Sequence, residues 1–185
     1  IAQQADGRFF LSGDFTFVNG LARNRIVRLN TDGTVDTSFD AGSGFSDSVQ
    51  EIGVQPDGRV VAVGHFISVN GVNRNRIARL NSDGSVDDTF NPGGGANNPI
   101  LDMLVQPDGR TVIVGDFSSF NGVSRKGVAR INSDGTLDET FGLGDGPDFS
   151  VHAVVMQRDG RVIIAGDFKN YDGVACEGVV RLNPD

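Results

Sequence analysis

Short apolar runs recur along the chain, and turn-forming residues separate them. Between residues 52 and 90 the runs cover 52–55, 59–66, 76–81 and 85–90, and Pro56-Asp57-Gly58 joins the first two. Runs of this length bounded by Pro, Asp and Gly predict β-strands, and a turn with Gly at its last position predicts a tight hairpin. We expect four antiparallel strands, A to D, in this stretch.

The second run of each group, strand B, is apolar almost without alternation, as in Val60-Val61-Ala62-Val63 and Val162-Ile163-Ile164-Ala165. A strand of this kind is buried on both faces, whereas a strand in a two-sheet sandwich has one solvated face and alternates. Sheets stacked face to face around an axis satisfy this requirement. The pattern therefore predicts an all-β protein with the blades of a β-propeller, and a β-solenoid ranks second.

The same pattern returns every 51 residues. Two series of Asp-Gly turns and one series of Gly-Asp-Phe or Gly-His-Phe share this spacing; their first residues are Asp6, Asp57, Asp108 and Asp159, then Asp32, Asp83 and Asp134, then Gly13, Gly64, Gly115 and Gly166. We expect one repeat domain over 1–185, with four-stranded units at about 1–48, 49–99, 100–150 and 151–185. Strand D is absent from the fourth unit. The chain begins at Ile1 within an expected strand, so it looks like part of a longer propeller or protein.

The sequence resembles the delta-60 repeat family of bacterial β-propeller proteins. The resemblance rests on Gln-Pro-Asp-Gly-Arg, Gly-Asp-Phe, Asn-Gly and Arg-Ile-Ala-Arg-Leu-Asn-Ser-Asp-Gly-Ser-Val-Asp-Asp-Thr-Phe, and it covers the whole chain. The fourth copy departs from this pattern, because Arg158 replaces the turn proline and Cys176 stands where Arg23, Arg74 and Arg125 stand. Membership in this family implies a multi-repeat bacterial protein that is secreted or held at the cell surface. It implies no ligand and no reaction.

Composition and charge narrow the choice of partner. The formal net charge of −8 disfavours nucleic acid as a ligand, since proteins that bind nucleic acid present basic surfaces. No apolar run reaches the roughly 20 residues of a membrane-spanning helix, and no signal-peptide pattern precedes the first strand, so we expect no membrane insertion. Cys176 is the only cysteine, which excludes an intrachain disulfide and a site built from several thiolates.

Two polar patterns recur in each unit. The first, Asn-x-Asp-Gly-x-x-Asp, gathers oxygen atoms that could bind calcium, but its spacing is not that of an EF-hand loop. Turns in which Asn and Asp side chains accept hydrogen bonds from nearby amides explain the same residues better, so we expect no cofactor or metal and keep calcium as the less favoured alternative. The residues are Asn30, Asp32, Asp36, Asn81, Asp83, Asp87, Asn132, Asp134 and Asp138.

The second pattern is a charge in strand C. Arg28, Arg79, Arg130 and Arg181 occupy one register there, while strand B ends in Asp14, Asp116 and Asp167, with His65 in the second unit. An Arg–Asp pair between strands B and C is the prediction, because an unpaired buried charge is costly. We interpret His65, and likewise His152, as held by local hydrogen bonds rather than as functional residues.

No enzyme signature is present in the sequence. It contains no Gly-x-Ser-x-Gly, no His-Glu-x-x-His, no phosphate-binding glycine loop and no paired cysteines, so we name no catalytic residue and expect no enzyme.

Candidate binding residues lie in the D-to-A connections. These run from Asp40 to Ser48, Asn91 to Pro99 and Gly142 to Ser150, and the alternation of strand direction places them on one side of the ring with the B-to-C loops. The candidates are Phe45, Asp47, Asn97, Asn98, Asp148 and Phe149.

The leading hypothesis is a noncatalytic recognition or adhesion module that binds protein or glycan on a cell surface. A passive structural spacer is the alternative, and an enzyme domain ranks third. Self-association to complete the ring is a further expectation.

Overall fold

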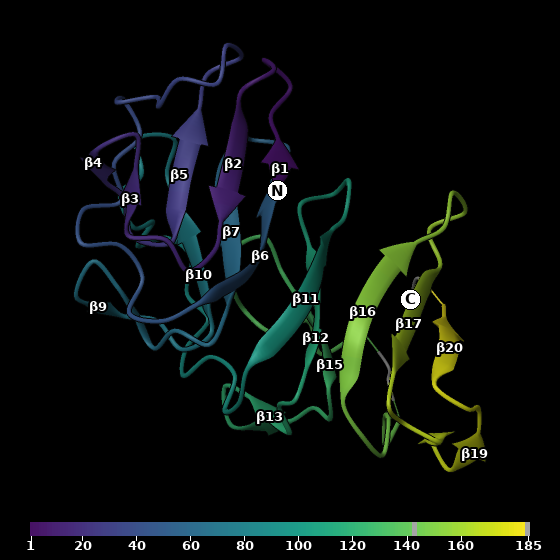
Figure 1. Cartoon of the computed structure of the whole chain (residues 1–185). Helices are drawn as coiled ribbons and strands as arrows, with labels where there is room; N and C mark the ends of the chain where they lie inside the picture. The colour runs from purple at the N-terminus through teal and green to yellow at the C-terminus, as the bar shows by residue number, and fades with distance from the viewer. Residues whose placement is uncertain (142–143, 184–185) are drawn as a thin grey trace.

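The computed structural model describes residues 1–141 and 144–183, and within them the regular structure is entirely β. Four antiparallel sheets of three strands follow one another along the chain, and Figure 1 shows them side by side in chain order along an open arc. The inner strands, which correspond to strand A, are β1 (Ala2–Gln3), β6 (Val49–Val54), β11 (Ile100–Val105) and β16 (Val151–Met156). The chain is therefore a series of propeller blades.

Strands B and C complete each blade outward. The central strands are β2 (Phe9–Ser12), β7 (Val60–Gly64), β12 (Thr111–Gly115) and β17 (Val162–Gly166). The outer strands are β5 (Ile26–Leu29), β10 (Ile77–Leu80), β15 (Val128–Ile131) and β20 (Val179–Leu182). The strand order A-B-C holds in every blade, for example β11-β12-β15 in the third.

The tight A–B turn forms as the sequence predicts. In the second blade Gly58 has φ of 83°, its amide donates to the Gln55 carbonyl at 2.9 Å, and the Gln55 amide donates to the Arg59 carbonyl at 2.8 Å. Pro56 and Asp57 supply the two residues before the glycine, where φ is negative. The hairpin then leads directly into β7.

Strand D is shorter than expected. In the second unit it is reduced to one antiparallel bridge between Leu80 and Val86, and the same bridge joins Leu29 to Val35 and Ile131 to Leu137. The chain turns away after this bridge because the Asp87 side chain accepts hydrogen bonds from both the amide and the hydroxyl of Thr89. We call residues 35–39, 86–90 and 137–141 the D segments.

The B-to-C connection contains a small hairpin that we did not predict. The four hairpins are β3 (Phe17–Val18) with β4 (Leu21–Ala22), β8 (Ser68–Val69) with β9 (Val72–Asn73), β13 (Ser119–Phe120) with β14 (Val123–Ser124), and β18 (Asn170–Tyr171) with β19 (Val174–Ala175). Asn70 and Gly71 at one tip both have positive φ, at 49° and 76°, which is a type I′ turn. The Asn-Gly pair carried this signal in the sequence.

The hydrophobic core lies between neighbouring blades. Val60, Val61, Ala62 and Val63 of β7 are all fully buried, the even-numbered side chains against blade 1 and the odd-numbered ones against blade 3. The prediction that strand B is buried on both faces is confirmed. One further core joins blades 3 and 4.

The predicted Arg–Asp pairing was wrong in its partner. Arg28, Arg79 and Arg130 do not pair with Asp14 or Asp116, which are exposed at the end of strand B. Instead each arginine Nε donates to an aspartate of its own D segment, Asp36 at 2.8 Å, Asp87 at 2.7 Å and Asp138 at 2.8 Å. The D segment lies directly beside the arginine because its aspartate also pairs through the backbone: the Asp36 amide donates to the Arg28 carbonyl at 2.9 Å, and the Asp87 amide donates to the Arg79 carbonyl at 2.9 Å.

Candidate functional site

The loops expected to carry the site do gather at one end of the blades. The hairpins β13–β14 and β18–β19 lie at the lower edge of Figure 1, opposite the A–B turns. The D-to-A connections run beside them, since Phe45, Ala96 and Pro147 form bridges with Val69, Phe120 and Tyr171. Gly142, the first residue of the third expected connection, lies outside the described residues.

Phe45 is not part of this surface. Its side chain is 2% exposed and packs edge to face on Phe66, with ring centroids 4.7 Å apart. The prediction treated Phe45 as an exposed aromatic group, but Gly42 and Gly44, both at positive φ, precede it, and its ring packs inward between blades 1 and 2. It belongs to the core.

Asn97 and Asp148 hold the loops together. The side-chain oxygen Oδ1 of Asn97 accepts hydrogen bonds from the backbone amides of Ser118 and Ser119, both at 3.0 Å. In the next connection, Oδ1 of Asp148 accepts from the backbone amides of Lys169 and Asn170, at 2.9 and 3.1 Å. Ser46 does the same in the second blade with its hydroxyl oxygen. The hydrogen bonds from the side chain and amide of Asn170 lower the pKa of Asp148. We call these three side chains the loop clamps.

The remaining candidates, Asp47, Asn98 and Phe149, are exposed and share one register of the repeat. Asp47 accepts a hydrogen bond from the Ser48 amide at 2.7 Å, and Asn98 donates a long one, 3.4 Å, to the Asp116 carbonyl. Phe149 is 66% exposed. Among the six predicted residues, it is the one that presents a large apolar surface to solvent.

A hollow of about 310 Å³ lies beside Phe149, between blades 3 and 4. Its lining includes Asp116 and Lys126, both exposed, as well as Phe149 and Gly127. We call it the loop-face hollow. It therefore combines an aromatic face, a carboxylate and an amine.

The loop-face hollow exists because of one change in the repeat. Gly127 stands where the first two blades have Arg25 and Arg76, and all three residues have φ of 65° or 66°. In those blades the arginine fills the space: the Arg25 Nη1 donates to the Phe45 carbonyl at 2.8 Å, and Arg76 donates to the carbonyls of His65 and Phe66. Glycine leaves that volume empty. The substitution could have been read from the sequence, but nothing there showed that the arginine faced inward.

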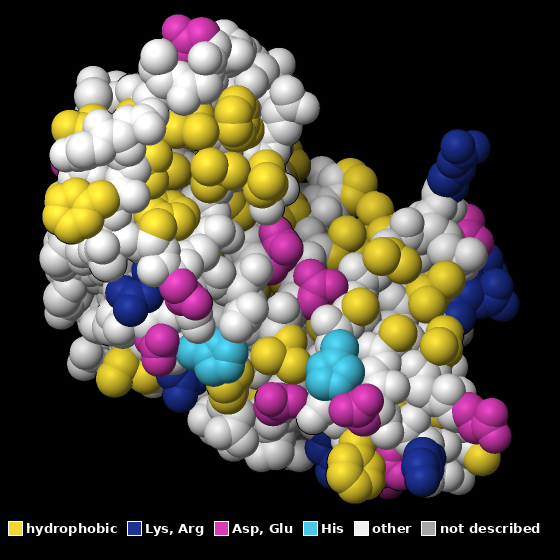
Figure 2. Space-filling view, viewed as in Figure 1, with side chains coloured by type: hydrophobic (Ala, Val, Ile, Leu, Met, Phe, Trp, Pro, Cys, Tyr) yellow, Lys and Arg dark blue, Asp and Glu magenta, His cyan; other side chains and the backbone are white. Residues whose placement is uncertain are grey.

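Both histidines are visible at the lower part of Figure 2, each near acidic side chains. His65 Nδ1 lies 3.1 Å from both the Ser48 hydroxyl and the Gln50 amide, and His152 Nε2 lies 2.8 Å from Asp167. These local hydrogen bonds agree with the interpretation drawn from the sequence. Within the described residues, no three His, Cys, Asp or Glu side chains are grouped to hold a metal ion.

The Asx turns expected in the Asn-x-Asp-Gly-x-x-Asp element are present. The Asp83 carboxylate accepts from the amide and the hydroxyl of Ser85 at 2.9 and 2.7 Å, and these bonds lower its pKa. The second aspartate of the element, Asp87, holds Arg79. The carboxylate oxygen atoms of Asp83 and Asp87 therefore accept hydrogen bonds from the turn, and the Asp87 carboxylate also pairs with Arg79.

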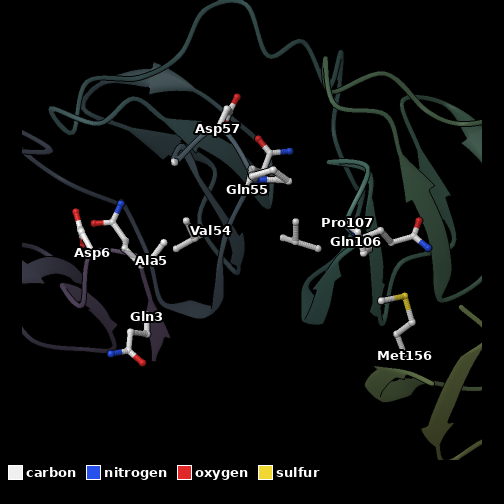
Figure 3. Close-up of a pocket in the computed structure, with 13 residues that line it drawn as sticks. Gln3, Ala5, Asp6, Val54, Gln55, Asp57, Gln106, Pro107 and Met156 are labelled. Carbon is white, nitrogen blue, oxygen red and sulfur yellow. The ribbon is translucent and has the colours of Figure 1, made fainter. Parts of the chain in front are cut away.

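A second hollow lies at the opposite end of the blades. It has a volume of about 610 Å³ and opens between the ends of the inner strands, with Gln3 and Val54 on one side and Gln106 and Met156 on the other (Figure 3). The side chain of Gln55 in this lining is already hydrogen-bonded, because its Nε2 donates to the Gly109 carbonyl of the next blade at 2.7 Å. Most of the lining comes from equivalent positions of the repeat, so this axial hollow follows from the arrangement of the blades.

Comparisons with known proteins agree with this architecture. The family model described as "Domain of unknown function (DUF5122) beta-propeller" matches four stretches of the chain, 4–39, 55–90, 106–141 and 157–185. No curated protein matches the sequence. No helix among the described residues is long and apolar enough to cross a membrane.

Solved propellers have the same fold at low sequence identity. The structure of YCF48 bound to D1 peptide superposes with a TM-score of 0.52 and 14% identity, over 100% of this chain and 50% of that one. PorZ, a bacterial surface component of the type-IX secretion system of Porphyromonas gingivalis, gives a TM-score of 0.54 and 15% identity, over 97% of this chain and 24% of that one. The chain thus spans half or less of these proteins, and the likeness concerns the fold alone.

Proposed function

The chain belongs to the DUF5122 β-propeller family, and we propose that it is a noncatalytic recognition module of a bacterial secreted or surface protein. In this proposal the face formed by the D-to-A and B-to-C loops binds a polar ligand, a glycan or a protein segment. The loop-face hollow is the contact site. Asp116, Lys126 and Phe149 make the contacts.

The observation that carries the proposal is the exposed ring of Phe149 beside a hollow that an arginine fills in blades 1 and 2. Exposed aromatic rings provide rigid apolar area at low entropic cost, and a few polar groups at the edge of a hollow orient the ligand. Asp116 supplies an acceptor and Lys126 a donor. This set suits a sugar, whose ring stacks on an aromatic face while its hydroxyl groups bond to charged side chains.

Departures from the repeat coincide at this position. Phe149 replaces Asp47 and Asn98, Lys126 replaces Asn24 and Asn75, and Gly127 replaces an arginine. If these positions only stabilised the blade, we would expect residues of similar size and polarity in each repeat. Three changes around one hollow favour a binding role at blade 3 over a passive spacer.

The two solved propellers provide limited support of another kind. One is bound to a peptide and the other is a bacterial surface component, so the fold is compatible with both parts of the proposal. Because fold and function are separable, they do not identify the ligand of this chain.

The test is a screen of the fluorescently labelled chain against a glycan array, followed by titration of the strongest glycan. We expect saturable binding that Phe149→Ala abolishes and that Phe17→Ala preserves, since Phe17 is also an exposed phenylalanine, at 67%, but lies on blade 1. Binding to no glycan and to no peptide of a matched peptide array would contradict the recognition role and favour the spacer. If Met156→Ala abolished binding and Phe149→Ala did not, the ligand would bind in the axial hollow instead.

A further inference from the structure

The arginine that follows the small B-to-C hairpin is held in the same way in blades 1 to 3. Its Nη1 donates to the carbonyl of the preceding residue, at 2.8 Å in Arg23, 3.0 Å in Arg74 and 2.9 Å in Arg125. This bond fixes the direction of the guanidinium group, which is still able to pair with an anion. The three arginines therefore form a matched series.

In the first two blades an aspartate is that anion, 3.6 Å from the arginine of blade 1 and 3.1 Å from the arginine of blade 2. These aspartates, Asp40 and Asp88, correspond in the sequence of blade 3 to Gly142 and Glu139. Arg125 makes no ion pair within residues 1–141 and 144–183. Because a guanidinium group stays protonated, Arg125 presents a charge that a ligand can neutralise.

The residue after this arginine also changes in blade 3. In blades 1 and 2 it is an asparagine whose Nδ2 donates to a carbonyl of the D-to-A connection, that of Ser43 at 2.7 Å and that of Gly94 at 2.9 Å. In blade 3 it is Lys126, which is exposed. A hollow of about 250 Å³, which we call the cationic hollow, lies there and is lined by Ser124, Arg125, Lys126, Gly144, Asp145 and Gly146.

The cationic hollow adjoins the loop-face hollow, because Lys126 lines both. A ligand that covers Phe149 in the loop-face hollow can therefore pass Lys126 and reach Arg125. The cationic hollow contains two cations and one carboxylate, that of Asp145, in a chain whose net charge is −8. Figure 2 shows basic, acidic and hydrophobic side chains together along the lower edge of the molecule. The excess of positive charge in this hollow favours an anionic group.

The backbone around the two hollows is already hydrogen-bonded. The amides of Ser118 and Ser119 donate to Asn97, and the Asp145 amide donates to the Asp172 carboxylate at 2.9 Å. An extended peptide that adds to a sheet edge requires unpaired backbone groups. Here the site offers charged side chains and an aromatic ring instead, which suits the hydroxyl and acidic groups of a saccharide better than a peptide backbone.

We propose that the ligand is an acidic saccharide whose carboxylate or sulfate group binds between Arg125 and Lys126 while a neighbouring sugar ring stacks on Phe149. This inference rests on the proposed recognition role and adds the class of ligand to it. The planar guanidinium group can donate two parallel hydrogen bonds to such an anion. Asp116 and Asp145 accept hydrogen bonds from hydroxyl groups of the same saccharide.

The experiment compares pairs of saccharides that differ in charge: an oligogalacturonate and its methyl ester, sialyllactose and its methyl ester, and a heparin oligosaccharide and its desulfated form. Titration calorimetry with the 185-residue chain should show an acidic member that binds about 10- to 100-fold more tightly than its neutral counterpart. Arg125→Ala abolishes this preference. Lys126→Asn, which restores the residue of blades 1 and 2, reduces it and keeps the test valid if the Arg125 variant does not fold.

Arg161→Ala is the matched control, because it removes an exposed arginine from the A–B turn at the opposite end of blade 4. We expect this variant to retain the preference for the acidic saccharide. If Arg161→Ala reduced the preference as much as Arg125→Ala, net charge rather than the cationic hollow would explain it, and the proposal would be wrong.

The remaining outcomes separate this inference from the proposed function. Equal affinity for both members of every pair, or binding to neutral glycans only, would overturn the acidic-saccharide proposal; if that binding still required Phe149, the recognition role would stand. Binding of an acidic peptide that requires Arg125, with no glycan bound, would overturn the saccharide class. Binding of neither glycans nor peptides would contradict the recognition role as well.

Discussion

The buried arginine of blades 1 to 3 carries a positive charge in a position where charges are rare. Arg79 is 3% exposed, and its Nε lies 2.7 Å from the Asp87 carboxylate. Removing one partner of a buried pair leaves the other charge unpaired, and that cost exceeds what the pair itself contributes. The pair therefore fixes where the D segment lies.

The chain offers a matched comparison for this pair. We expect Asp87→Ala to reduce the free energy of unfolding by about 3–5 kcal/mol, whereas the neighbouring Asp88→Ala costs at most about 1 kcal/mol. Asp88 is exposed and lies 3.1 Å from Arg74 at the surface. Urea unfolding followed by circular dichroism measures both variants, and equal effects would contradict the account of Arg79.

A pH dependence follows from the same group of side chains. Burial acts to raise the pKa of Asp138, but hydrogen bonds from Thr140 and Arg130 outweigh it and lower the pKa from 3.8 to about 2. Because the folded-state pKa lies below the unfolded one, the stabilisation is complete above about pH 4 and is lost as the pH falls through 2. It amounts to about 2 kcal/mol.

Unfolding free energies of the wild type and Asp138→Asn, measured between pH 5 and pH 2, test this assignment. The wild type loses stability over this range, and the variant, which lacks the titrating group, loses about 2 kcal/mol less. Parallel curves for the two proteins would show that Asp138 does not contribute.

The identity of the arginine's partner was beyond reach of the sequence. Both Asp14 and Asp36 recur with the repeat, and the choice between them depends on the path of the D segment, which brings Asp36 beside Arg28. That path could not be read from the sequence. Burial of the arginine, by contrast, followed from its place within an apolar strand.

Among the elements, the A–B hairpin and strands A, B and C were predictable because their turn residues and apolar runs agree. Strand D was not, since Val86 and Phe90 look like a strand while Asp87 bends the chain between them. Differences between the repeats also led us to name Asn97 and Asp148 as candidate binding residues, although they occupy one structural position that stabilises the loops. Ser46, Asn97 and Asp148 differ in sequence but perform the same task, because each supplies an oxygen acceptor to two amides.

The loop clamps can be tested by substitutions that keep or remove the acceptor. Asn97→Ala removes the acceptor of the Ser118 and Ser119 amides and should cost about 0.5–1.5 kcal/mol, whereas Asn97→Asp keeps the acceptor and should cost less than about 0.5 kcal/mol. Thermal unfolding compares the two. If both variants lost the same stability, size or polarity rather than hydrogen bonding would explain the position.

At the scale of the whole molecule, repetition explains most of the fold, and departures from repetition locate the candidate site. The sequence showed the 51-residue period and the side of the ring on which the variable loops lie, and it included Phe149 among the candidates. It could not show that Phe45 points inward, because Phe45 and Phe149 stand two residues apart in register and both lie in glycine-rich connections. Nor could it show the hollow left by Gly127, which requires the path of Arg25 and Arg76.

The measurement that tests the central claim most directly is ligand affinity after the loop-face hollow is refilled with the residue that blades 1 and 2 use. Gly127→Arg introduces a side chain on the backbone conformation of Arg25 and Arg76, with a Cβ about 3.1 Å from the Gly115 carbonyl oxygen, so only small shifts of its neighbours are needed. If the chain recognises its ligand in this hollow, titration of the strongest glycan or peptide will show at least about a tenfold loss of affinity, or about 1.4 kcal/mol, while the unfolding temperature stays near that of the wild type. Unchanged affinity in a folded Gly127→Arg variant would contradict the account.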